Sequence, residues 1–236
     1  MAEDSRAHLL FEGQLGHLVA TLVLLAALIA AADLPGFADG EWLGLSTVVW
    51  IWLTVGDAIL HQLFVWICWR LQLHGQTLTR RCGDRAFPAY KAIFAVLILL
   101  RPILIFALGW ANRGTLAIDP WLGYAVSLVL LGPAVYLMYS VVHFFGVDRA
   151  FGIDHFDPAY RTASLVRRGI FRWTPNAMYV FGFFALWIPA FLFQSVAALA
   201  VAAFSHAYIW VHFFCTERPD MRRIYGPPRD ALTSRT

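Results

Sequence analysis

The stretch that decides the fold is MYVFGFFALWIPAFLFQSVAALAVAAFSHAYIWVHFF, residues 178–214. It consists of two apolar runs, Met178–Phe193 and Ala197–Phe214, separated by little more than Gln194 and Ser195. A helix needs about 20 apolar residues to cross the hydrocarbon of a bilayer. The stretch therefore predicts a tight hairpin of two membrane helices, the first of which is short.

The rest of the chain has the same apolar character. Of its 236 residues, 60% are hydrophobic and 14% are charged, and its mean hydropathy is +0.63. Soluble domains carry roughly 45–50% apolar and about 25% charged residues. Four further long apolar runs precede the hairpin: Leu15–Ala32, Ser46–Trp69, Ala92–Trp110 and Leu122–Phe145. The sequence thus predicts an all-α polytopic membrane bundle of about six transmembrane helices, without a separate soluble domain.

The positive charges are distributed unevenly over the predicted loops. Sixteen of the 18 Lys and Arg residues lie before the first span, after the last, or in the second and fourth connections. The opposite connections contain only Arg113, and Arg101 lies inside the third span. Because cytoplasmic loops are enriched in Lys and Arg, we expect both termini to be cytoplasmic. The acidic N-terminus is unlike a signal peptide, so we expect the first span to be retained.

Ionisable residues inside the predicted spans are candidates for function, because inserting one costs about 2.5–3.5 kcal/mol. Asp57 and His61 lie one helical turn apart in the second span, and Arg101 could pair with Asp57 across the bundle. These groups could relay protons, or they could hold the helices together as a buried polar pair, which is the commoner use. The three cysteines form no Cys-x-x-Cys pair, and no metal centre is predicted.

Two short motifs accompany the hairpin. LVRRGIFRWTPNAMYVFG (residues 165–182) leads into it, and TERPDMRRIYG (residues 216–226) follows it. Together they resemble the signature of the integral-membrane methyltransferases, which include the isoprenylcysteine carboxyl methyltransferases and the phospholipid N-methyltransferases. The family pattern runs Leu-Val-x-x-Gly-x-Tyr-Arg-x-x-Arg-His-Pro-x-Tyr-x-Gly, and a Glu-Glu pair follows the last span. The resemblance covers about residues 122–226.

The chain departs from this pattern at the centres of both motifs. Pro175 and Ala177 stand where the family has Arg and Pro, with Asn176 at the His position. Arg218 replaces the second Glu of the pair. These exchanges keep open a non-catalytic transporter or assembly factor of related fold. An NADPH-dependent membrane sterol or steroid reductase is a further alternative, although the tail after Tyr225 matches it poorly.

The resemblance implies a methyltransferase that binds S-adenosylmethionine. The residues that it assigns to cofactor binding are Gly169, Arg172, Asn176, Tyr179, Gly182, Glu217 and Arg218. Glu217 could hold the ammonium of the cofactor and an arginine its carboxylate, by charge-assisted hydrogen bonds. His212 or Glu217 could act as the catalytic base. His212 and Glu217 are expected to lie, with Tyr208 and Thr216, on one stripe that points to the cytoplasmic mouth.

Two local features of the loop before the hairpin are also predicted. Asn176 is suited to cap the helix that follows, or to hydrogen-bond the adenine. Residues 149–169 are expected to cover the cofactor. Alternatively, Asp154, His155 and Asp157 belong to a solvated loop with a turn at Asp157-Pro158.

The chain is expected to divide at residue 121. Residues 1–121 hold the first three spans, and residues 122–236 hold the methyltransferase-like core with its loop and tail. The acceptor is expected to be lipophilic and to enter from the bilayer, with a phospholipid amine, a lipidated thiol or carboxylate and a small thiol all open. The preponderance of Arg over a single Lys points to a GC-rich bacterial genome and to the inner membrane. No nucleic acid partner is predicted.

Overall fold

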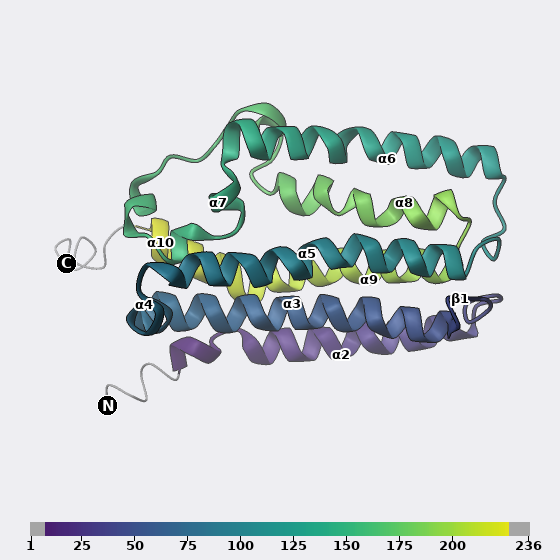
Figure 1. The fold of residues 1–236 in the computed structure, drawn as a ribbon, viewed down its shortest axis with the longest axis horizontal. Helices are drawn as coiled ribbons and strands as arrows, with labels where there is room; N and C mark the ends of the chain where they lie inside the picture. Colours follow the sequence, from purple (N-terminus) through teal and green to yellow (C-terminus); the bar gives the residue numbers. More distant parts are fainter. Residues whose placement is uncertain (1–7, 227–236) are drawn as a thin grey trace, which may run out of the picture.

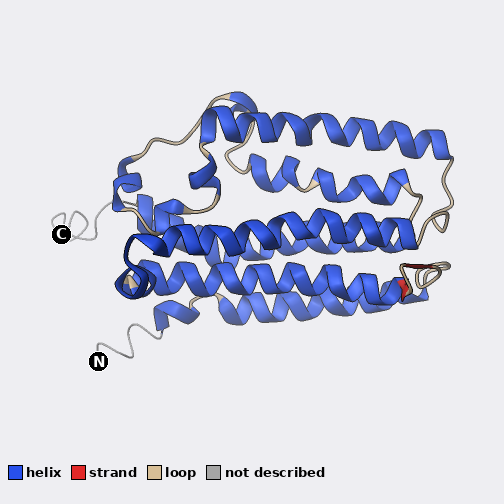
Figure 2. Cartoon of the chain, in the orientation of Figure 1, coloured by secondary structure: helices blue, strands red, loops and turns tan. Residues whose placement is uncertain are grey.

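The structure is a computed structural model and describes residues 8–226 of the chain. Its helices run along the long axis of the molecule as a bundle (Figure 1). The main helices are α2 (Gln14–Ala30), α3 (Thr47–Gly75), α5 (Ala86–Ala111), α6 (Pro120–Ser140), α8 (Phe184–Leu192) and α9 (Val196–His212). In the described part, strand is confined to the antiparallel pair β1 (Glu41–Trp42) and β2 (Leu45–Ser46) (Figure 2). The predicted all-α fold is confirmed.

Short helices gather at one end of the bundle, on the left in Figure 1. They are α4 (Thr77–Cys82), α7 (Val147–Ala150) and α10 (Arg218–Tyr225). We call this the α10 end, and the opposite end, where β1 lies, the β end. Single turns of 3₁₀-helix occur at Ala31–Asp33, Gly83–Arg85, Ile153–His155, Pro158–Thr162 and Gly169–Arg172.

Five helical stretches in residues 8–226 are long and apolar enough to cross a membrane. They are His8–Asp33, Thr47–Gly75, Thr77–Ala111, Pro120–Phe145 and Val196–Tyr225. The fifth predicted span, Met178–Phe193, corresponds to a shorter helical stretch, Met178–Leu192. At 1.5 Å per residue it extends about 22 Å, less than the roughly 30 Å of the hydrocarbon core. The polytopic membrane bundle is therefore confirmed, with five full-length helices and the short one that the sequence predicted.

The first and last described residues, His8 and Gly226, both lie at the α10 end (Figure 1). The cytoplasmic placement of this end stays a prediction from the charge distribution. Three of the arginines that support it, Arg6, Arg229 and Arg235, lie outside the described residues.

The connection between α8 and α9 is as tight as predicted. Ser195 caps α9, because its hydroxyl accepts a hydrogen bond from the Ala198 backbone at 3.0 Å. The buried amide of Asn112, at the end of α5, accepts hydrogen bonds from the Ser195 hydroxyl at 2.8 Å and from the Ala197 backbone at 2.9 Å. The hairpin is thus tied to α5 at the β end.

The main core lies among α3, α5, α8 and α9, so both predicted parts of the chain contribute to it. The face of α9 inside this core carries small residues that are completely buried, Ala197, Ala198, Val201 and Ala202. Small side chains let membrane helices approach closely. Large apolar residues such as Leu22, Leu60, Ile103 and Leu128 are exposed on the outside, as expected of a lipid-facing surface.

A polar cluster is buried between α3 and α5. The guanidinium of Arg101 lies 3.4 Å from the Asp57 carboxylate and 3.0 Å from Nδ1 of His61. All three side chains are almost inaccessible to solvent. The pairing of Asp57 with Arg101 across the bundle is therefore confirmed, and it offsets the cost of burying two opposite charges.

Candidate active site

Three π-helical turns lie at helix ends that face the α10 end. The turn η3 (Val141–Phe145) continues α6, η7 (Met178–Gly182) leads into α8, and η8 (Phe213–Glu217) joins α9 to α10. A π-helical turn closes its hydrogen bonds five residues apart, so it changes the direction of the side chains that follow it. Such turns are rare and frequently mark functional sites.

All three π-helical turns contribute to one cavity of about 660 Å³. Phe145 comes from η3, Met178 and Tyr179 from η7, and Phe213 and Glu217 from η8. The remaining wall comes from α10, from α7 and the loop between α7 and η6 (Gly169–Arg172), from Pro175 and Asn176, and from α3. This volume lies within the range of about 300–1,000 Å³ that is usual for small-molecule sites.

Four of the eight residues predicted from the sequence line this cavity: Asn176, Tyr179, Glu217 and Arg218. They come from both motifs, which the α8–α9 hairpin brings together at the α10 end. The other four, Gly169, Arg172, Gly182 and His212, lie outside the lining. The structure assigns these four to packing or to the surface.

The carboxylate of Glu217 carries the strongest indication of a ligand. Its Oε2 atom is inaccessible to solvent and has no hydrogen-bond partner among the described residues. A buried carboxyl oxygen without a partner is costly, so such groups are normally satisfied by a cation or a donor. Because Glu217 lines the cavity, a positively charged group of a ligand would satisfy it there.

The cavity also contains cationic and aromatic groups. Arg149, Arg218 and Arg222 are among the residues that line it. Arg149 lies over the Phe145 ring at 5.3 Å and donates a hydrogen bond to the Tyr225 hydroxyl at 3.4 Å. The site therefore offers an anion, several cations and aromatic faces to one bound molecule.

The comparison with known families agrees with this geometry. Residues 122–228 match the model of the phospholipid methyltransferase family. The C-terminal part of the chain is thus similar to this family. The resemblance to integral-membrane methyltransferases is thereby confirmed, over nearly the same residues as the sequence motifs indicated. No curated protein and no solved structure matched the chain.

The residues that match the family model supply all of the cavity lining except Trp69, which comes from α3. The Trp69 ring approaches the loop at Gly152, where a Cβ atom would lie 2.5 Å from the indole. Gly152 also has a φ of +80°, a conformation that glycine adopts without strain. Sequence analysis missed Trp69 because it was one apolar residue at the end of a predicted span.

The two glycines of the first motif have packing roles. Gly169 has a φ of +58°, and a Cβ there would lie 2.6 Å from the Phe144 ring and from the Ser140 hydroxyl. Ser140 accepts a hydrogen bond from the Ile170 backbone at 3.1 Å. A Cβ on Gly182 would lie 3.0 Å from Leu137. Both glycines thus let the motif pack against α6.

Arg172 lies on the surface rather than in the cavity. Its guanidinium is over the Trp173 ring at 5.0 Å, and the Trp173 side chain is 58% exposed. An exposed aromatic residue with an arginine beside it is typical of a membrane interface. The structure therefore does not bring Arg172 to the predicted site.

The predicted stripe from Tyr208 to Glu217 is wrong. Tyr208, His212 and Thr216 are buried, and two of them contact α2 directly. Tyr208 hydrogen-bonds His17 at 3.0 Å, and Thr216 accepts a hydrogen bond from Gln14 at 3.1 Å. Glu217 faces the cavity instead. The prediction assumed a continuous α-helix, whereas η8 changes the direction of the side chains after His212.

The predicted capping role of Asn176 is also wrong. The helix begins with η7, and its start carries no side-chain cap hydrogen bond. Asn176 takes part through its backbone carbonyl, which accepts hydrogen bonds from Tyr179 at 3.0 Å and Val180 at 3.1 Å. Its side chain lines the cavity and is therefore available to a ligand.

The loop of residues 146–168 lines the cavity through several residues, among them Arg149, Asp154 and Leu165. The solvated-loop alternative is wrong for Asp154 and His155, which are 7% and 5% exposed. The turn at Asp157 is confirmed, because its carboxylate accepts a hydrogen bond from the Ala159 backbone at 2.8 Å. The loop is thus a structured wall of the cavity.

Ionic contacts hold this wall in place. Oδ1 of Asp154 lies 3.2 Å from Nδ1 of His155, and Oδ2 accepts a hydrogen bond from the Tyr225 hydroxyl at 2.8 Å. Burial alone would raise the pKa of Asp154, but these hydrogen bonds outweigh it and lower the pKa. Burial likewise disfavours charged His155, but Asp154 and Asp220 outweigh it and raise its pKa.

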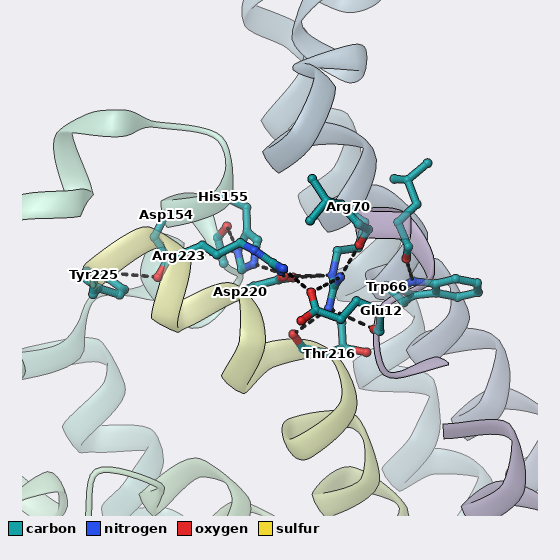
Figure 3. A network of polar contacts seen from close by, with 12 residues as sticks. Glu12, Trp66, Arg70, Asp154, His155, Thr216, Asp220, Arg223 and Tyr225 are labelled. Carbon is teal, nitrogen blue, oxygen red and sulfur yellow. Dashed lines mark hydrogen bonds and ion pairs between the residues drawn. The ribbon is translucent and has the colours of Figure 1, made fainter. Parts of the chain in front are cut away.

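A larger polar network extends from His155 across α10 to residues 9–14, which we call the N-terminal segment (Figure 3). Nε2 of His155 lies 3.6 Å from Asp220, and Asp220 pairs with Arg70 of α3 at 2.8 Å. Glu12 forms ion pairs with Arg70 and with Arg223. The network joins segments from both predicted parts of the chain next to the cavity.

Proposed function

We propose that the cavity binds S-adenosylmethionine and that the chain transfers its methyl group to a lipophilic acceptor. The observation that carries this proposal is the unpartnered Oε2 of Glu217, which lies in the wall of a cavity inside the phospholipid methyltransferase family region. The family indicates a methyltransferase in general terms. The cofactor and the acceptor are inferred from the chemistry of the lining.

The lining offers a partner for each part of the cofactor. The Glu217 carboxylate is suited to the ammonium, and Arg218 or Arg149 to the carboxylate, because charge-assisted hydrogen bonds are the strong ones. Tyr179 offers an aromatic face to the adenine or the sulfonium, since cations are attracted to the faces of such rings. Asn176 is suited to hydrogen-bond the adenine edge.

When bound, S-adenosylmethionine supplies an electrophilic methyl group on sulfur. The task of the chain is then to orient the acceptor and to exclude water, for which the loop and α10 form the walls. Of the two bases predicted from the sequence, Glu217 is the one that lines the cavity. His212 packs against Trp69, with 5.7 Å between ring centroids, and is not assigned a role in catalysis.

Apolar residues of the lining favour a lipophilic acceptor. Phe145, Leu165, Met178 and Phe213 form this part of the wall, and Leu165 is 66% exposed. An exposed apolar residue at a cavity in a membrane protein suits the passage of a lipid. We propose further that the α10 end faces the cytoplasm of a bacterial cell, where a water-soluble cofactor is accessible.

Ligand titration tests the proposal. The purified protein in detergent is titrated by calorimetry with S-adenosylmethionine and S-adenosylhomocysteine. We expect binding by the native chain and a loss of at least tenfold in affinity for Glu217→Gln, which removes the charge but keeps the shape. Glu41→Gln, an exposed change in β1 at the opposite end, is the control and should leave affinity unchanged. Absence of binding by the native chain would overturn the proposal, and NADPH binding would favour a reductase.

A further inference from the structure

One buried side chain contacts the residues on both sides of Glu217. Arg70, from α3, is completely inaccessible to solvent. Its Nη2 donates a hydrogen bond to the backbone carbonyl of Thr216 at 3.4 Å, and its Nε lies 2.8 Å from Oδ1 of Asp220. Thr216 directly precedes Glu217, and Asp220 follows it by three residues. Figure 3 shows Arg70 between these partners.

The N-terminal segment packs on the same part of η8. Arg70 also donates hydrogen bonds to the backbone carbonyls of Leu9 and Glu12. Gln14 donates a hydrogen bond from its side-chain amide to the Thr216 hydroxyl at 3.1 Å. A Cβ on Gly13 would lie 2.4 Å from the Cys215 carbonyl oxygen, so the segment approaches the turn as closely as glycine allows.

These contacts matter because Glu217 lies in a π-helical turn. The direction of a side chain in such a turn depends on the contacts that stabilise the turn, since the regular α-helical pattern is interrupted. Arg70 is suited to this task, because its planar guanidinium carries five donors in fixed directions. A buried guanidinium must keep its partners, so it constrains the backbone around Glu217 strongly.

We propose that Arg70 is a positioning residue of the cofactor site, which directs the Glu217 carboxylate into the cavity through Thr216 and Asp220. This inference rests on the proposed binding of the cofactor ammonium by Glu217. It extends the site beyond residues 122–228, because both Arg70 and the N-terminal segment lie outside the family match.

Two ligands distinguish positioning of Glu217 from a general structural role. S-adenosylhomocysteine carries the ammonium, whereas 5′-methylthioadenosine lacks the amino-acid part. We expect Arg70→Lys, which cannot reproduce the fork of donors, to lower the affinity for S-adenosylhomocysteine at least tenfold. Its affinity for 5′-methylthioadenosine should stay within about twofold, because contacts to the adenosine part remain. Arg81→Lys, an exposed change in α4, is the control.

A double variant tests whether the effect passes through Glu217. If it does, Arg70→Lys with Glu217→Gln binds S-adenosylhomocysteine no more weakly than Glu217→Gln alone. The inference would be overturned if the affinity losses of the two single variants added up in the double variant. It would also be overturned if Arg70→Lys lowered the affinity equally for both ligands. If the native chain binds neither ligand, the proposed function fails and this inference fails with it.

A second variant covers the case in which Arg70→Lys does not fold. Gln14→Ala removes the contact with the Thr216 hydroxyl and leaves the buried ion pair intact. We expect a smaller loss, about threefold, for S-adenosylhomocysteine and no change for 5′-methylthioadenosine. Unchanged affinity for both ligands in a folded Gln14→Ala variant would count against positioning by this set of contacts.

Discussion

The hydroxyl of Tyr225 donates a hydrogen bond of 2.8 Å to the carboxylate of Asp154, and this contact joins two walls of the cavity. Tyr225 ends α10, and Asp154 belongs to the loop between α7 and η6. The contact therefore links the second sequence motif to a loop for which a solvated form was one alternative.

Removing this contact should loosen the loop. We expect Tyr225→Phe to lower affinity for S-adenosylhomocysteine at least tenfold, since a hydrogen bond to a charged group contributes roughly 1.5–3 kcal/mol and about 1.4 kcal/mol is a factor of ten. Limited trypsin digestion should also cleave the loop faster, at Arg167 or Arg168. Tyr124→Phe, an exposed change near the start of α6, is the control. Unchanged digestion of Tyr225→Phe would show that the contact does not hold the loop.

The raised pKa of His155 predicts how stability depends on pH. Folded His155 holds its proton to a higher pH than the unfolded residue, whose pKa is about 6.5. Its contribution is thus fully present below about pH 6.5 and is lost as pH rises through the folded value, by up to about 1.4 kcal/mol per pH unit. The pKa of Asp154 is lowered, so its contribution to stability is lost in a separate, acidic pH range, as pH falls through the folded value.

Thermal unfolding in detergent between pH 6 and 8.5 measures this effect. The melting temperature of the native chain should exceed that of His155→Gln most at pH 6, and the difference should shrink as pH rises. The exposed His143 provides the control, and His143→Gln should leave the pH dependence unchanged. A difference between native chain and His155→Gln that is constant over this range contradicts the prediction.

The sequence predicts the bundle well because the bilayer restricts the possible folds. Long apolar runs can cross the hydrocarbon only as helices, so span lengths and the tight connection at Gln194 and Ser195 could be read directly. Asp57 and Arg101 were also predictable as a pair, since two buried charges of opposite sign need each other. These features depend on the length of each apolar segment and on the charges that it carries.

The π-helical turns were not predictable, because they arise from packing between segments and carry no residue pattern. Their absence from the prediction explains why His212 was placed at the site. Arg70 was missed for a different reason. Counting charges assigns every arginine near a span end to a loop, whereas Arg70 is completely buried by partners up to 150 residues away in the sequence.

The Asp57–Arg101 pair can be tested as a structural or a proton-relay element. Asp57→Ala leaves the buried Arg101 charge without its carboxylate and should destabilise the protein by about 3–5 kcal/mol. Asp57→Leu with Arg101→Met replaces both charges by apolar groups and should be much less destabilising. If the double variant still transfers methyl groups at the native rate, the pair is structural. A stable but inactive double variant would instead support a relay.

Two glycines with positive φ differ in the space around them, so replacing each by alanine measures the cost of backbone strain with and without steric crowding. Gly114→Ala should cost about 1–2 kcal/mol, the usual penalty for a left-handed residue, because a Cβ there meets no atom within 4 Å. Gly169→Ala should cost clearly more, since its Cβ also meets Phe144 and Ser140. Thermal unfolding measures both changes. Equal destabilisation would show that crowding at Gly169 is relieved without cost.

Asn176 and Asp119 form a matched pair for the last prediction. Both precede a helix, but only Asp119 caps it through its side chain, which accepts hydrogen bonds from Trp121 at 2.9 Å and Leu122 at 3.1 Å. Asp119→Ala should therefore destabilise the protein by about 1 kcal/mol and leave ligand affinity unchanged. Asn176→Ala should do the opposite, because its side chain lines the cavity and makes no hydrogen bond with another described residue.

Thermal unfolding and calorimetric titration with S-adenosylhomocysteine measure the two effects on the same samples. We expect Asn176→Ala to weaken binding about threefold to tenfold, the range for one lost hydrogen bond of roughly 0.5–1.5 kcal/mol. Asn176→His, which restores the residue type of the family pattern, should bind at least as well as the native chain if this position contacts the cofactor. If Asn176→Ala lowers stability as much as Asp119→Ala and leaves binding intact, the residue has a structural function and not a ligand-binding one.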